Sequence, residues 1–167
     1  MNLGILLLAA LVPLIIGFIW YNPIFLGKAW MRAADVSEEK LKTGNMVVIF
    51  LLTYLLSFFI AAIMQSIVIH QTHMMSTLLT EPGINDPKSE IGMLYANFMA
   101  KFGHNYRTFR HGALHGTIAG VFLALPILGI NAMFERKKFK YIAINAGFWI
   151  ISLAIMGGII CKYIKLG

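Results

Sequence analysis

The chain has 167 residues, of which 59% are hydrophobic and 13% are charged, whereas a soluble domain is usually about 45–50% apolar and about 25% charged. This composition excludes an ordinary soluble domain and places the chain among membrane proteins. Basic residues outnumber acidic ones by 14 to 7. In a membrane protein such an excess reflects orientation and anionic lipid, so we infer no nucleic-acid binding.

Four apolar runs are long enough to cross a bilayer, which takes about 20 helical residues. They are residues 3–21, 46–70, 112–134 and 141–161, and none of them contains Asp, Glu, Lys or Arg. The first run lacks a basic leader and an A-x-A-like cleavage site, so we expect a retained span rather than a signal peptide. The sequence therefore predicts an all-α fold over residues 1–167, a four-helix transmembrane bundle in a single integral membrane domain.

Aromatic residues gather where the first span ends. Trp20 and Tyr21 precede Pro23, and Trp30 follows Gly27. Trp and Tyr concentrate at membrane interfaces, so we interpret this stretch as an interfacial belt in which Pro23 breaks the helix. An aromatic pocket for a lipid or quinone is the alternative.

The same stretch resembles the pattern G-x-x-W-Y-x-P-x-x-F-G-x-x-W of the bacterial membrane family catalogued as domain of unknown function 1761. The matching residues are Gly17, Trp20, Tyr21, Pro23, Gly27 and Trp30, while Leu26 replaces the phenylalanine and Phe25 stands one position earlier. Residues 131–136, 144–147 and 156–157 are similar to the family as well. The resemblance implies four spans and implies no activity.

Two helices are predicted outside the spans. Asp35 and Glu38 have capping-box spacing, which predicts a short helix in the first connector. Between spans two and three, Asp86 and Pro87 form a helix-start signal, and apolar residues at helical spacing then predict an amphipathic helix over 87–102. We interpret it as a lid on the bundle or the headgroup layer, with a docking helix for a partner as the alternative.

Glycines mark the expected helix-packing surfaces. Gly112, Gly116 and Gly120 are four apart at the start of the third span, so they share one helix face and allow another helix to approach closely. In the fourth span Gly147 and Gly157 are further packing candidates. Asn145 in that span is expected to make an interhelical hydrogen bond, because an unpaired amide in hydrocarbon is costly.

All five histidines fall between the end of span two and the start of span three. His70 and His73 are expected to share one helix face, and His111 and His115 another. Antiparallel spans bring the two regions to one side of the membrane, where imidazoles can bind zinc or copper, or a cross-helix pair can ligate haem. The competing interpretation is that these are polar residues at helix ends, and we expect no resident metal or cofactor.

Basic residues set the expected orientation. The first and third connectors hold eight Lys or Arg against six in the middle segment and C-terminal tail, and Arg136-Lys-Lys-Phe-Lys140 is the tightest basic cluster. The positive-inside rule then predicts a multi-pass protein of the bacterial cytoplasmic membrane with both termini and residues 71–111 on the outer side.

No catalytic motif is present: the sequence has no nucleophile elbow, P-loop, HExxH or paired intramembrane carboxylates. We therefore expect a protein that is not an enzyme and has no catalytic residues. The interpretation we favour is an accessory or assembly subunit of a larger membrane complex, or a homo-oligomer, whose partners are the lipid bilayer and other membrane subunits or copies of itself. A histidine-based metal or haem protein, or a small transporter, is the alternative.

Overall fold

The computed structural model describes residues 2–165, and within that part of the chain every regular element is a helix. Four helical segments are long and apolar enough to cross a membrane. The segments are α1–α2 (Leu3–Ala10 and Val12–Trp20), α5 (Met46–Val68), α8–η1–α9 (Phe109–Ala119, Gly120–Ala124 and Leu125–Phe134) and α10 (Phe139–Tyr163). The predicted all-α class and the four spans are thus confirmed.

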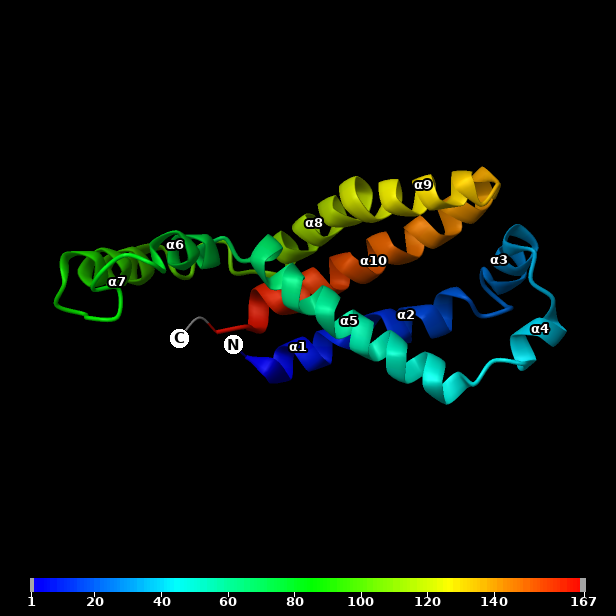
Figure 1. The fold of residues 1–167 in the computed structure, drawn as a ribbon, viewed down its shortest axis with the longest axis horizontal. Coiled ribbons are helices and arrows are strands. Elements are labelled where there is room, and N and C mark those ends of the chain that lie inside the picture. The colour runs from blue at the N-terminus through cyan, green and yellow to red at the C-terminus, as the bar shows by residue number, and fades with distance from the viewer. Residues whose placement is uncertain (1, 166–167) are drawn as a thin grey trace.

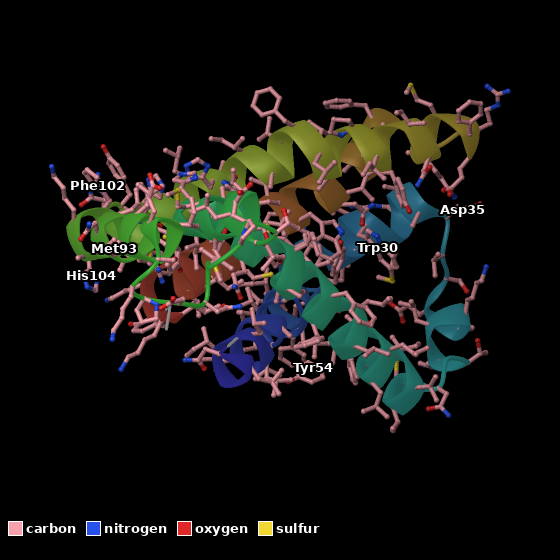
Figure 2. The ribbon with its side chains drawn as sticks, turned by 60° about the vertical axis from the view of Figure 1, so that its left-hand side comes forward. Trp30, Asp35, Tyr54, Met93, Phe102 and His104 are labelled. Atoms are coloured by element: carbon pink, nitrogen blue, oxygen red, sulfur yellow. The ribbon has the colours of Figure 1, made fainter. Side chains whose placement is uncertain are left out.

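The spans run antiparallel along the long axis of the molecule (Figure 1). The first connector, with α3 (Gly27–Ala34) and α4 (Glu38–Lys42), lies at one end together with the turn between α9 and α10. The other end carries both termini and a helical hairpin of α6 (Gln71–Leu78) and α7 (Glu90–Phe102). The hairpin projects beyond the spans and does not lie across them, as a lid on the bundle would. Figure 2 labels Phe102 and His104 at the hairpin end and Asp35 at the opposite end.

Helix boundaries differ from the predicted ones where local signals compete. The third span begins at Phe109, three residues early, because Thr108 caps it by accepting the backbone N–H of His111. The amphipathic helix begins at Glu90, because Ser89 is the N-cap and the Asp86-Pro87 turn comes before it. In the first connector Ser37 caps α4, so the predicted cap at Asp35 is wrong. Asp35 instead ends α3 in a left-handed conformation, φ 60°.

The fourth span, α10, is the central helix of the bundle. It contacts α1, α2, α3, α5, α8 and α9. More than half of the residues in its membrane-spanning stretch are buried. Met156, Ile160 and Cys161 are fully buried on it and join a core that includes Leu6 and Met64. In a bilayer such packing stabilises the bundle through van der Waals contact rather than through removal of apolar surface from water.

The closest packing is between α8 and α10, along the predicted glycine face. A Cβ atom on Gly112 would lie 2.2 Å from the carbonyl oxygen of Gly157, and one on Gly120 would lie 2.7 Å from the Cα of Ile150. Gly147 lies elsewhere on α10, where a Cβ atom would meet the Trp20 ring at 3.0 Å. Backbone-to-backbone contact of this kind is how small residues join helices in membranes.

Two prolines interrupt their spans. Val12-Pro13 follows a turn at Leu11, which separates α1 from α2. In the third span Pro126 lacks the N–H that would bond to Phe122, and the preceding turn widens into the π-helix η1, where the Leu125 N–H bonds to the Gly120 carbonyl.

The aromatic residues after span one attach that end of the chain to α10. The indole of Trp20 donates to the Ile144 carbonyl at 3.0 Å, and the Tyr21 hydroxyl donates to Oδ1 of Asn145 at 2.9 Å. The interhelical hydrogen bond expected of Asn145 is therefore confirmed. Trp30 packs edge-on against Tyr21 with ring centroids 5.4 Å apart. Pro23 is exposed in the turn, and Gly27 approaches the Tyr21 carbonyl, where a Cβ atom would stand at 2.3 Å.

Candidate metal centre

Three histidines converge at the end of the bundle that carries the termini. The Nε2 atom of His70 lies 3.0 Å from Nε2 of His111 and 3.3 Å from Nε2 of His115. One ring nitrogen from each of the three lies within 4.8 Å of the other two. The geometry thus brings three potential ligand atoms from two spans to a common point.

Hydrogen bonding does not account for this arrangement. A neutral imidazole Nε2 is either a donor or an acceptor, so the one on His70 makes a single good hydrogen bond and leaves its second neighbour without one. A tetrahedral zinc ion about 2.05 Å from two imidazole nitrogens holds them about 3.3 Å apart. The two distances from His70 are close to that value, so His70 stands at metal-ligand spacing from each of the other two histidines.

His70 is held at the junction of α5 and α6 by the residues on either side of it. Ile69 leaves the helix in an extended conformation and is fully buried in the core. Gln71 is buried as well, and its Nε2 donates to the carbonyls of Phe102 at 3.0 Å and Asn105 at 2.8 Å. The two buried neighbours place the imidazole of His70 opposite α8.

His111 and His115 are fixed by their own helix. They lie four residues apart on α8, each directly before a glycine that packs on α10, so both imidazoles share one face. Tyr106 stacks on the ring of His111 with centroids 5.2 Å apart. The position of α8 against α10 therefore determines where these two ligands stand.

The other predicted ligand lies outside the centre. His73 is on α6 and exposed, with its ring centroid 6.4 Å from that of His70. It does not share a face with His70, because the chain leaves the helix at Ile69. His104 is exposed at the hairpin end and is not one of the three. The sequence prediction did not include Gln71 or Tyr106. The one signal that could have identified them is their position close to the histidines in the sequence.

The surroundings of His70 favour its neutral form. Partial loss of hydration lowers the pKa of His70, which is still exposed, below its usual range, and the neighbouring imidazoles of His115 and His73 lower it further. A neutral imidazole is the form that ligates a metal. Among the residues that the structure describes, no carboxylate or thiol joins the cluster.

No curated protein and no solved structure matches this chain. A family model does, over residues 5–161, which include the second and third spans in full, nearly all of the first and fourth, and the three histidines. The chain therefore belongs to the family described as protein of unknown function DUF1761.

Proposed function

We propose that this membrane protein binds a divalent transition metal through His70, His111 and His115, and that its role is binding rather than catalysis of its own. The observation that carries the proposal is the approach of the His70 Nε2 atom to both other Nε2 atoms at 3.0 and 3.3 Å. Imidazole ligands suit zinc, copper, iron and nickel. Three ligands leave a fourth tetrahedral position open to solvent or to another molecule.

The same distances favour a bare ion over haem. Two axial histidines bind haem iron from opposite faces of the porphyrin. Nitrogen atoms separated by 3.0 to 3.3 Å leave no room for a macrocycle between them. The expectation of no cofactor is therefore replaced by the proposal of a metal ion.

Metal content of the purified protein tests the proposal. We expect about one zinc per chain by elemental analysis after exposure to Zn²⁺ and removal of excess, and at least a tenfold weaker affinity in His70→Ala and His115→Ala. His104→Ala is the matched control, because His104 is an exposed histidine of the same end and is outside the cluster. Equal zinc binding by the His70→Ala, His115→Ala and His104→Ala variants would contradict the proposal.

A second candidate function is that of an accessory or assembly subunit, or a homo-oligomer. The observation that favours it is a pair of exposed apolar side chains on α7, which lies outside the four spans: Met93 is 48% and Leu94 is 49% exposed. Apolar side chains exposed beyond the hydrocarbon region are typical of a surface that another protein covers.

Native mass spectrometry after mild-detergent purification tests this second candidate. We expect a larger assembly that Leu94→Glu disrupts. Ser76→Glu is the control, because Ser76 is exposed on α6, the other helix of the hairpin, and the substitution adds the same charge away from α7. A clean monomer in both variants and in the parent would remove this candidate.

We also propose that the metal centre faces the outer side of a bacterial cytoplasmic membrane. The support is the distribution of basic residues, eight at the end with α3, α4 and the α9–α10 turn against six at the end with the histidines.

A further inference from the structure

An apolar groove of about 320 Å³ opens between α5, α8–η1–α9 and α10. Its walls carry almost no polar surface, and its volume is within the usual range for a small-molecule pocket, about 300–1,000 Å³. The lining residues that matter here are Ile67 on α5, Ala119 and Leu123 on α8–η1, and Trp149 on α10. The groove is formed by the spans themselves, so its occupant must be apolar.

On α8 the groove begins one helical turn from the metal centre. Ala119 follows His115 by four residues, which places it one helical turn, about 6 Å, further along the same side of α8. On α5, Ile67 stands three residues before His70. The residues close in sequence to the ligands, on α8 and at the end of α5, therefore also form part of the groove wall.

The π-helix η1 lies in the middle of the groove wall. Its residues Leu123 and Ala124 both line the groove, and Pro126 is the second residue after η1. A π-helix is wider than an α-helix and turns successive side chains to new directions, and such segments are frequent at functional sites. The irregular turn thus shapes the wall where an elongated apolar molecule would lie.

The charge of the metal centre determines which polar group an apolar molecule in the groove must carry at that end. Three neutral imidazoles leave the full double charge of a divalent ion uncompensated, and no carboxylate joins the three histidines in the described residues. A net charge at the edge of a low-dielectric medium is costly unless an opposite charge pairs with it. An anionic oxygen in the open fourth position provides that charge, and zinc accepts oxygen ligands.

We propose that the metal centre and the groove together form a binding site for a lipid with a phosphate-monoester head. A phosphate oxygen occupies the fourth position on the metal, and one acyl chain lies in the groove past Ala119 and Leu123 toward Trp149. The second acyl chain stays in the bilayer. This inference rests on the proposed metal site and names its ligand.

Fluorescence quenching tests the site in phosphatidylcholine nanodiscs. Phosphatidic acid with brominated acyl chains is the probe, and phosphatidylcholine with the same brominated chains is the headgroup control. Trp149 lines the groove. Subtracting the fluorescence of the Trp149→Phe variant from that of the parent protein leaves the fluorescence of Trp149 alone, without that of the other tryptophans. We expect zinc-loaded protein to be quenched at least fivefold more efficiently by the phosphatidic acid, and chelation of zinc to abolish the difference.

Groove variants separate the acyl chain from the headgroup. Ala124→Phe fills the groove and is expected to remove the preference while zinc content is unchanged. Ile130→Phe is the matched control, because Ile130 is half exposed on α9 and does not line the groove. Leu123→Phe is a second groove variant in case Ala124→Phe does not fold. Equal quenching in the groove variants and the control would overturn the proposal.

The outcomes distinguish this proposal from the metal site itself. Stoichiometric zinc with equal quenching by the two brominated lipids overturns the lipid proposal and leaves the metal site standing. Displacement of the phosphatidic acid by a small excess of inorganic phosphate identifies a free-phosphate site and also overturns it. Failure to bind zinc overturns the metal site and, with it, the lipid headgroup interaction.

Discussion

Gly116 on α8 and Leu153 on α10 lie so close that a Cβ atom on Gly116 would stand 2.0 Å from the Leu153 carbonyl oxygen. The neighbouring atom belongs to the backbone, so it cannot move aside as a flexible side chain does. The distance between the two helices is therefore set by the missing side chain. His115 directly precedes Gly116, so the same contact fixes the position of a proposed metal ligand.

The first prediction is that Gly116→Ala destabilises the bundle by about 1–3 kcal/mol, the usual cost of overpacking. The added methyl group must push α8 away from α10. Thermal unfolding in detergent, followed by helical circular dichroism, measures the loss. Gly129→Ala is the control, because a Cβ atom there would make an ordinary contact at 3.9 Å. Equal destabilisation of both variants would show that the close approach has no special role.

The sequence predicts which residues of α8 pack closely, but not their partner. Spacing of four puts Gly112, Gly116 and Gly120 on one face by helical geometry alone. The carbonyl groups that they meet, on Leu153 and Gly157, belong to a helix whose rotation follows from packing across the whole bundle. A local pattern carries no information about that rotation.

The histidine cluster was predictable only in part for a related reason. The histidines at the two span ends are visible in the sequence, yet nothing there ends α5 at Val68: no Gly or Pro follows, and Ile69 is apolar. The helix breaks there because Ile69 is buried in the core and because the Gln71 side chain donates a hydrogen bond to the Phe102 carbonyl at the end of α7. These tertiary contacts separate His70 from His73, which a continuous helix would have kept on one face.

The second prediction concerns the attachment of the first span to α10. Tyr21→Phe removes the 2.9 Å hydrogen bond to Asn145, and such bonds in membrane proteins contribute about 0.6 kcal/mol on average and up to about 1.7 kcal/mol. We expect a loss of unfolding free energy in that range, measured by denaturation in mixed micelles. Tyr163→Phe is the control, since Tyr163 is 50% exposed at the end of α10. No change in Tyr21→Phe would mean that water replaces the bond.

The third prediction is a dependence of metal-free stability on pH. Because the pKa of His70 is lowered in the folded state, the unfolded chain binds a proton first as the pH falls below the usual histidine value of about 6.5. The free energy of unfolding is therefore unaffected by His70 above that pH, and it decreases as the pH falls toward the lowered pKa. The groups facing His70 are the imidazoles of His73, His111 and His115.

Melting temperatures of the chelator-treated protein between about pH 8 and pH 5 measure this slope. We expect His70→Asn to have a shallower slope than the parent protein, while His104→Asn retains the parent slope. An identical slope in His70→Asn would assign the pH dependence to other groups.

The fourth prediction places the metal centre relative to the membrane. Single cysteines at Lys88, in the α6–α7 connection, and at Lys138, in the α9–α10 turn, stand at exposed positions at opposite ends of the bundle. With a membrane-impermeant maleimide on intact cells, we expect Lys88→Cys to be labelled and Lys138→Cys to be labelled only after permeabilisation, because the positive-inside rule predicts a cytoplasmic position for the basic α9–α10 turn. The parent chain is the control, since its one cysteine, Cys161, is buried and should stay unlabelled until denaturation. Labelling of both positions from one side would contradict the four-span topology. The reverse pattern would keep the four spans but place His70, His111 and His115 at the inner face. Their metal would then come from the cytoplasm, and the groove would take its lipid from the inner leaflet.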